Sequence, residues 1–397
     1  MLPDHSLRLA GPGRGPTRLV AAVAALATTA ALAACSSAAA SGDHPAALGI
    51  TFNTAQCGGH WHAKPGLRTF QITNESGAAA EVYLINPANN AIFGSLDALG
   101  TGTTSPMQVQ LGSGKYAFQC VIDDFDPFTG PTVTVPGQVK GQAGIVPVTD
   151  NELIGPSKEY HAYVTTGLAV LDTQTTALAK DVQAGNLKAA KAAWLTAHLT
   201  YERLGAAYGT FGDFDGEIDG RADGLPKGVH DPGFTGFYRI EYGLWHGQSA
   251  AELTKPAGQL LGYVRGLRKA FPTQEQDLLD VGLRTHEILE NALEFQLTGH
   301  DDYGSGTTLA TTVANIVGTK ELLTVLHPLL VSRYTALPAV YTWLSRLQTL
   351  LQAQDHHGVW TPVSKLSTSA REEIDAAASQ SLTELAPIAA ITEPRRV

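Results

Sequence analysis

The chain has 397 residues, of which 44% are hydrophobic and 16% are charged, and its formal net charge at neutral pH is −10. This length allows two or three domains. The acidic balance argues against a nucleic-acid partner, because proteins that bind nucleic acids present basic patches to the phosphates. It suits a protein that handles cations, although acidity is also an ordinary way to keep a protein soluble.

Residues 1–34 are predicted to be a lipoprotein signal peptide. Arg14 and Arg18 precede an apolar, alanine-rich run, as in export signals. The run ends in Leu-Ala-Ala-Cys, which resembles a bacterial lipobox, so Cys35 is the expected lipid anchor of an extracytoplasmic protein held at the cell membrane. The alternative is an ordinary secretory signal that leaves a spare cysteine. Residues 35–46, rich in Ser, Ala and Gly, are predicted to be a flexible tether.

The next segment, 47–138, is predicted to form a β-sandwich. Short stretches alternate apolar and polar residues and are separated by Gly, Pro, Asn and Ser, as strands joined by turns are. Several short strands in so few residues are typical of a sandwich. The strand candidates are 48–53, 67–73, 80–85, 107–111, 116–122 and 132–135.

Two cysteines, Cys57 and Cys120, lie in this segment. Two cysteines in an exported domain pair by default as a disulfide. The alternative is a cation site made of both thiols, Glu81 and the acidic residues that follow Cys120. A blue-copper centre is not expected, because it needs a Cys-His₂ set and no histidine follows Cys120 before His161.

The remaining chain, 155–390, is predicted to be all-helical and to follow a linker at 139–154. Apolar residues recur there at spacings of three and four, and Thr273 with Gln276 is the expected capping box of one helix. Eight helices joined by short loops predict two packed four-helix units. The helix candidates are 157–183, 187–208, 233–247, 257–270, 274–297, 307–326, 337–354 and 367–385.

Three pairs of polar residues have the spacing of metal ligands on helices: His198/Glu202, Tyr238/Glu241 and His286/Glu290. His198 and Glu202 are four apart, and Tyr238 and Glu241 are three apart, so each pair shares one helix face. The interiors of helix bundles bind metals through side chains at these spacings. The first two pairs therefore predict a site with mixed nitrogen and oxygen donors, which suits iron, manganese or zinc.

An acidic run between these two pairs adds oxygen donors. Carboxylates at such density repel one another unless they are solvated or bind a cation. We assign Asp215 and Asp219 of this run to the metal site. The alternative is a solvated acidic loop between two helices, because runs of like charge usually lie at the surface. The run does not place glycine and glutamate as an EF-hand does.

A peptidase motif is absent from the sequence. Zinc peptidases of the His-Glu-x-x-His type need two histidines one turn apart, but His286-Glu287 is followed by Glu290 where the second histidine would stand. His286 and Glu290 are expected to support a site or to form a polar network. The sequence thus favours metal binding over proteolysis.

Four separated segments carry motifs that occur together in one known family. They are Tyr-Glu-Arg at 201–203, the segment 211–221, Gly-Phe-Tyr-Arg-Ile-Glu-Tyr-Gly-Leu-Trp at 236–245, and 284–299 followed by Asp-Tyr-Gly-Ser-Gly-Thr. These motifs resemble the imelysin-like family, and within it the branch of the EfeO and EfeM iron-uptake lipoproteins.

One position departs from the family pattern. The metal motif of the family is His-x-x-Glu, and Tyr238 stands at the histidine position while Glu241 is retained. The site then needs another nitrogen donor, which we assign to His198, or must rely on oxygens. An oxygen-dominated site would favour ferric iron, which Tyr238 is then expected to bind as a phenolate.

The resemblance implies iron, ferric or ferrous, with zinc or copper as alternatives, and a cupredoxin-like fold for the β-sandwich. It implies capture of iron outside the cytoplasmic membrane, delivery to a membrane iron permease, and a haem-peroxidase partner. The family was first grouped as metallopeptidases, so a metal-dependent extracytoplasmic peptidase is one alternative. A surface lipoprotein that binds polysaccharide and no metal is another.

Overall fold

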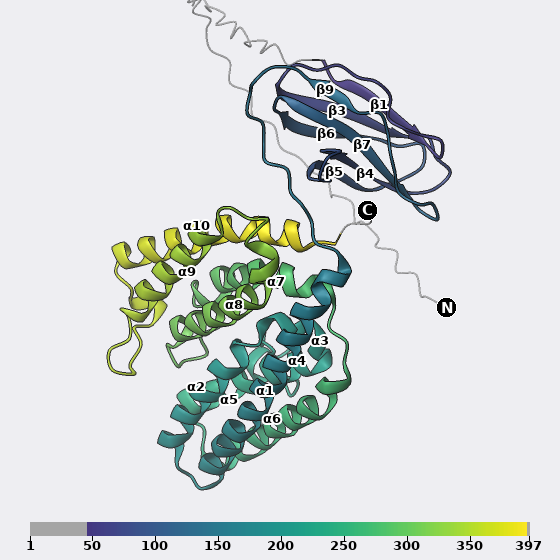
Figure 1. Ribbon diagram of the computed structural model, residues 1–397. Helices are drawn as coiled ribbons and strands as arrows, with labels where there is room; N and C mark the ends of the chain where they lie inside the picture. The colour runs from purple at the N-terminus through teal and green to yellow at the C-terminus, as the bar shows by residue number, and fades with distance from the viewer. Residues whose placement is uncertain (1–45, 395–397) are drawn as a thin grey trace, which may run out of the picture. The chain divides into compact units, whose positions relative to one another are not determined.

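The computed structural model describes residues 46–394. The predicted signal peptide, the anchor Cys35 and nearly all of the tether lie outside these residues. The described chain forms a β-sandwich followed by an all-helical domain, which confirms the predicted fold class (Figure 1).

Two sheets form the β-sandwich. One has the strand order β2-β1-β3-β6 and the other β5-β4-β7-β8, with β9 paired to β7. Large apolar side chains such as Phe70, Ile72 and Phe118 fill the core between the sheets. The strands are β1 Leu48–Asn53, β2 Gln56–Cys57, β3 Gly66–Asn74, β4 Ala80–Ile85, β5 Ile92–Leu99, β6 Thr104–Leu111, β7 Gly114–Ile122, β8 Phe128–Thr129 and β9 Val133–Val135.

The six predicted strands are all present, whereas β5 and the two-residue strands β2 and β8 were not predicted. Most residues of β5 are half-buried. The segment therefore lacks the alternation of exposed and buried positions by which a strand is recognised in a sequence. Its Gly94 lies so close to β6 that an added Cβ would be 2.9 Å from the Val109 side chain. Glycine therefore serves a close approach of strands here rather than a turn.

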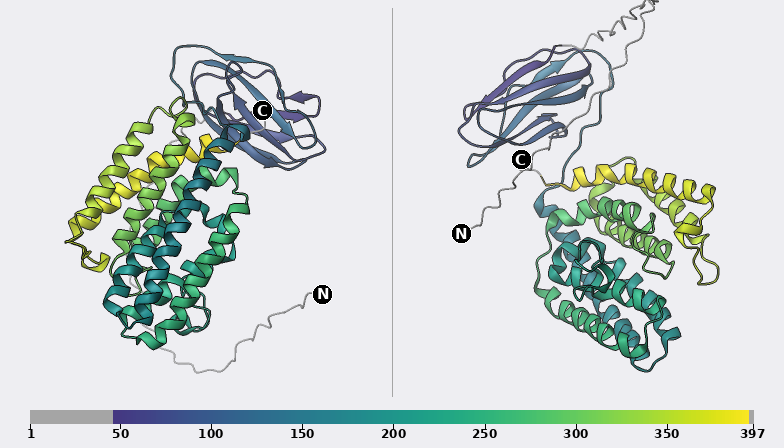
Figure 2. Two further views of the ribbon diagram at one scale, coloured as in Figure 1. Left: turned by 60° about the horizontal axis from the view of Figure 1, so that its bottom comes forward. Right: turned by 180° about the vertical axis from the view of Figure 1, so that it is seen from behind.

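The helical domain contains the two predicted four-helix units. Helices α1, α2, α5 and α6 pack together, and so do α7, α8, α9 and α10 (Figures 1 and 2). The helices are α1 Asp150–Gln183, α2 Leu187–Glu202, α3 Tyr208–Phe211, α4 Asp213–Asp219, α5 Gly236–Trp245, α6 Ala250–Ala270, α7 Leu278–Asn291, α8 Thr308–Leu330, α9 Leu337–Gln352 and α10 Thr368–Thr392.

Helices α1 and α6 begin earlier than predicted. We expected them to begin next to Pro156 and Pro256, but both prolines lie inside the helices. Capping boxes start the helices instead, at Thr149 for α1 and Ser249 for α6. Proline removes one intrahelical hydrogen bond, whereas a capping box satisfies two backbone donors at the helix start.

The capping box predicted at Thr273 and Gln276 is wrong. Thr273 ends a short 3₁₀ turn, and its hydroxyl donates to the carbonyl of Ala270. The side chain of Asp277 accepts a hydrogen bond from the backbone of Leu279 and caps α7. Asp is as good a cap as Thr, so the pattern alone did not separate the two starts.

Helix α8 joins the two units. Within the described part of the chain it is the one helix long and apolar enough to cross a membrane, yet 72% of its apolar window is buried inside the fold. It packs against α1 and α2 of the first unit and against α7 and α9 of the second. Helix α8 is thus a mostly buried core helix that packs against both units.

Candidate metal centre

Helix α2 brings two of the predicted ligands to the junction of the two units. His198 and Glu202 lie in its last turns and are buried, with 2% and 4% of their surfaces exposed. Their spacing of one turn places Nε2 of His198 3.0 Å from Oε1 of Glu202. The predicted shared helix face is therefore present at this pair.

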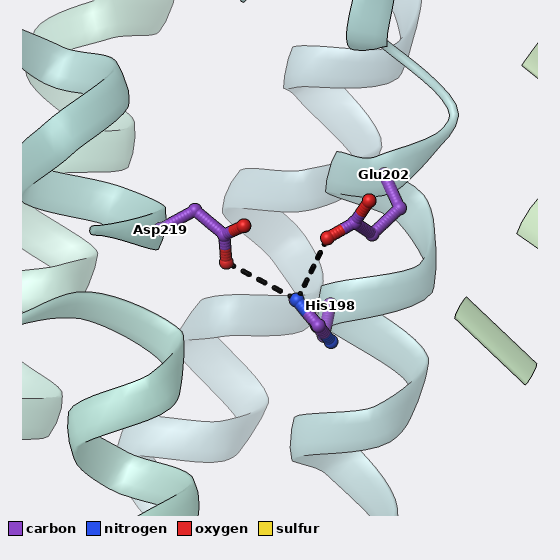
Figure 3. A group of neighbouring side chains, drawn as sticks. All are labelled: His198, Glu202 and Asp219. Carbon is purple, nitrogen blue, oxygen red and sulfur yellow. Dashed lines mark hydrogen bonds and ion pairs between the residues drawn. The ribbon is translucent and has the colours of Figure 1, made fainter. Parts of the chain in front are cut away.

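A third ligand candidate comes from α4. The acidic run folds as a short helix whose Ile218 is buried in the core, and Asp219 ends it. Oδ1 of Asp219 lies 3.1 Å from the same Nε2 of His198 (Figure 3). The acidic run is thus partly a structured wall of the site and not an open solvated loop.

Gly236 fixes α5 against α4. It begins α5 with a φ of +78°, and an added Cβ would lie 2.1 Å from the carbonyl oxygen of Ile218. Only glycine combines this left-handed backbone with so close an approach. The contact places α5, which carries Tyr238 and Glu241, directly beside the residue that precedes Asp219.

Burial and charge oppose each other at His198. Burial alone would lower its pKa, but the charges and hydrogen bonds of Asp219 and Glu202 outweigh burial and raise the pKa well above its usual value. Burial, with the nearby charge of Glu202, raises the pKa of Asp219 well above its usual value, although His198 lowers it. His198 thus lies between the side-chain oxygens of two acids, Glu202 and Asp219.

A polar cavity of about 270 Å³ opens beside this cluster. Asp215 lines it and accepts a hydrogen bond of 2.7 Å from the hydroxyl of Tyr201. Burial raises the pKa of Asp215, and Tyr201 opposes that shift. The lining residues are Glu202, Gly205, Tyr208, Asp215, Asp219, Arg221, Tyr238, Arg284, Ile288, Asn291, Phe295, Gln296, Asp301 and Asn315.

Tyr238 lines the same cavity with its hydroxyl turned to another carboxylate. The hydroxyl donates to Oδ2 of Asp301 at 3.2 Å, and the ring lies edge-on to His198. Burial and the charges of Asp219 and Asp301 raise the pKa of Tyr238 well above its usual value. In this surrounding the phenol keeps its proton unless a cation displaces it.

Asp301 is a buried acid that sequence analysis did not assign to the site. Burial raises its pKa to about 6, against the opposing charge of Arg221. Gln296 donates to its Oδ2, while its Oδ1 has no hydrogen-bond partner and lies 3.8 Å from Arg221. The sequence signal that could have identified Asp301 is the acidic pair Asp301-Asp302, at the start of the family motif Asp-Tyr-Gly-Ser-Gly-Thr.

Glu241 lies outside the cluster. Its Oε1 accepts hydrogen bonds from the backbone amides of Tyr303 and Ser305, at 3.1 and 2.9 Å. Burial raises the pKa of Glu241 to about 7, although the hydrogen bonds of Ser305 lower it. The structure thus directs this carboxylate to the loop that follows α7, away from the Nε2 that Glu202 and Asp219 share.

Helix α8 contributes a further polar contact that sequence analysis missed. The amide nitrogen of Asn315, when it faces Glu202, donates to Oε2 of Glu202 at 2.9 Å and to its carbonyl oxygen at 3.0 Å. Both partners are acceptors, so this orientation is the one that satisfies them. No spacing or motif singles out an asparagine in an apolar helix, and only the tertiary fold reveals its role.

The other candidate residues lie elsewhere. His286 and Glu290 pair on α7 at 3.6 Å, and neither lines the cavity. Cys57 and Cys120 form a disulfide, so neither offers a thiolate to a metal. Glu81 stands opposite Val121, whereas Cys120 stands opposite Val82. Because neighbours along a strand face opposite sides, Glu81 points away from the disulfide.

The cluster fits a small cation. Within residues 46–394 it is the one group of three or more His, Cys, Asp or Glu residues whose ligand atoms all lie within 4.8 Å of one another. It offers one nitrogen and two carboxylates, a donor set suited to first-row divalent metals. Nδ1 of His198 is buried without a partner, so the tautomer that frees Nε2 breaks no other hydrogen bond but leaves its Nδ1–H unpaired.

Comparisons with known proteins agree on one family. A family model described as imelysin (peptidase M75) matches residues 156–388, more than half of the chain. The "Iron uptake system component EfeO" of Yersinia pestis is 29% identical over 282 residues, which cover 71% of this chain and 73% of the relative. The protein of the same name from Escherichia coli O6:H1 is 28% identical over 271 residues, with 66% and 68% covered.

A solved structure also aligns with the chain. It is an iron-regulated protein A precursor from Parabacteroides distasonis, 12% identical, with a TM-score of 0.46, and the alignment covers 62% of this chain and 96% of that one.

Proposed function

The chain belongs to the imelysin family, and from this premise we propose that it is an extracytoplasmic component of an iron-uptake system, which captures an iron cation and passes it to a membrane permease. The relatives named EfeO, similar over about two thirds or more of their length, support iron as the cargo. A lipid anchor at Cys35 would hold the protein at the membrane, and a haem-peroxidase partner and a cupredoxin-like β-domain belong to the same proposal.

The observation that carries the proposal is the meeting of three donors at one point. Glu202 and Asp219 lie within 3.1 Å of the same nitrogen of His198, from two different helices. A proton on this nitrogen would point at the two acids, and a divalent cation that binds there would replace it. The adjoining cavity leaves room for water ligands that complete the coordination.

We assign His198, Glu202 and Asp219 as the ligands of the cargo. Asp215 adds negative charge from the cavity wall, and Tyr238 acts as a donor to Asp301 rather than as a ligand. Nitrogen and carboxylate donors suit ferrous iron, and they also suit zinc. Glu241 orders the 303–305 backbone that closes one side of the site.

A peptidase finds less support in this geometry. A zinc peptidase keeps a carboxylate free as general base beside the metal-bound water. Here Glu202 and Asp219 both face His198, and the other acids of the cavity are tied to Tyr201 or Tyr238.

Anaerobic titration of the purified protein with ferrous iron tests the proposal. We expect saturable binding of one ion per chain and no turnover of peptides. Absence of any metal binding would favour the alternative of a non-metal surface lipoprotein, and metal-dependent cleavage of peptides would favour the peptidase.

A further inference from the structure

Glu202 is held by contacts at both of its carboxylate oxygens. Oε1 faces Nε2 of His198 at 3.0 Å. Oε2 and the backbone carbonyl of the same residue both accept from Asn315, which is itself buried with 5% of its surface exposed. One residue from the second four-helix unit therefore fixes the rotation of a ligand that the first unit provides.

The close packing of α8 makes this contact. Gly318, one turn after Asn315, lies so near the end of α2 that an added Cβ would be 2.6 Å from the carbonyl oxygen of Arg203. The amide of Asn315 also satisfies one of the carbonyls that remain unpaired at the C-terminus of every α-helix. The asparagine is thus placed by two features that do not involve a metal.

We propose that Asn315 is a positioning residue that sets which cations the site accepts. Because its amide holds Oε2 on the side of α8, the carboxylate of Glu202 is oriented to present Oε1 to a cation. A carboxylate that binds through one oxygen suits small first-row cations, whereas Ca²⁺ takes more oxygens and often binds both oxygens of a carboxylate. The site would then exclude Ca²⁺. This inference rests on the proposed function, in which the same three residues are the metal ligands.

Two substitutions remove the donor. Asn315→Leu keeps the branched shape and frees Oε2, and Asn315→Asp keeps both shape and volume but presents an acceptor that repels Oε2. Outer groups that orient ligands change metal affinity by about 10- to 100-fold when removed. We therefore expect the ratio of the Ca²⁺ to the Zn²⁺ dissociation constant to fall by about tenfold or more in both variants.

Thr319→Val is the matched control. Thr319 lies one turn further along α8, is fully buried, and its hydroxyl has no hydrogen-bond partner. Replacing it disturbs the packing of α8 at the same depth without touching Glu202. Its Ca²⁺ to Zn²⁺ ratio should stay within about twofold of the natural protein.

The experiment is calorimetric titration of each purified protein with Zn²⁺ and with Ca²⁺, with near-ultraviolet circular dichroism as the test of folding. If Asn315→Leu does not fold, the shape-preserving Asn315→Asp carries the comparison. An unchanged ratio in a folded Asn315 variant, or an equal change in Thr319→Val, overturns the inference while the metal site stands. If the natural protein binds neither cation, the inference falls, whereas the titration with ferrous iron decides the proposed function.

Discussion

Nε2 of His198 lies 3.0 Å from Oε1 of Glu202, one helical turn further along α2. With Asp219 at 3.1 Å from the same nitrogen, one proton is held where we place the cation. This relationship makes cation capture a proton exchange, and several consequences can be measured.

Cation affinity should rise with pH. The pKa of His198 is raised well above its usual value by Asp219 and Glu202, which outweigh its burial, so the cation must displace a proton that His198 holds more tightly than an exposed imidazole does. One proton released per ion gives about tenfold tighter binding per pH unit until the raised pKa is passed. Titrations from pH 6 to 8, in buffers of different ionisation enthalpy, measure both the slope and the proton count.

His198→Gln supplies the control for this pH dependence. It removes the proton that competes with the cation, so the variant should bind more weakly but with a flatter pH profile. A natural protein whose affinity does not change from pH 6 to 8 would contradict the exchange.

Tyr238 should not bind iron as a phenolate. Burial and neighbouring acids raise its pKa, and its hydroxyl already donates to Asp301. Ferric iron should therefore produce no phenolate charge-transfer band, and Tyr238→Phe should lower the free energy of unfolding by about 1 kcal/mol through the lost hydrogen bond. A visible band that disappears in Tyr238→Phe would instead make Tyr238 a ligand.

Glu241 should destabilise the metal-free protein as pH rises. Its pKa is about 7 in the fold against 4.5 in the unfolded chain, so the fold holds the extra proton between these values. This proton contributes about 3 kcal/mol to the free energy of unfolding below about pH 4.5, and the contribution is lost as the pH rises toward 7. Glu241→Gln, which still accepts the two backbone amides through its oxygen, should gain this amount relative to the natural protein.

Denaturant unfolding at pH 4.5 and pH 7, with a chelator present, measures the difference. Glu159→Gln, on the exposed face of α1, is the control and should show the same pH dependence as the natural protein. Parallel curves for Glu241→Gln and the natural protein would show that Glu241 does not carry this linkage.

The disulfide should stabilise the β-sandwich independently of metal. Cys57 and Cys120 are 63 residues apart, and a crosslink that closes a loop of this length contributes about 2–4 kcal/mol. Replacing both cysteines with alanine should lower the free energy of unfolding by that amount with or without iron. When the unreduced protein is treated with an alkylating reagent, mass spectrometry should find both cysteines unmodified. Two thiols that react without metal and are protected by metal would indicate a ligand role instead.

The elements that could be predicted from sequence are those with a strong local pattern. The apolar spacing of the helices and the alternation in strands such as β1 and β6 were sufficient to predict both domains. Strand β5 failed because Gly94 and its half-buried neighbours break the alternation. The starts of α1 and α6 were predicted too late, because prolines such as Pro156 and Pro256 usually stand at helix boundaries.

The site was predictable only where its residues are close in sequence. The spacing of four on one helix identified His198 and Glu202, and the acidic run supplied Asp219. Asp301 and Asn315 come from segments about one hundred residues further along the chain, and only packing brings them to the cavity. Glu241 was expected among the ligands from its spacing, yet backbone amides of a distant loop hold it elsewhere.

The most direct test of the account compares two aspartates of one segment. Asp219 faces His198, whereas Asp223 lies at the surface, with 56% of its side chain exposed. In anaerobic titrations with ferrous iron, Asp219→Asn should weaken binding by about 100-fold or more, and Asp223→Asn by less than about threefold. Equal affinities of the Asp219→Asn variant and the natural protein would contradict a cation held between His198, Glu202 and Asp219.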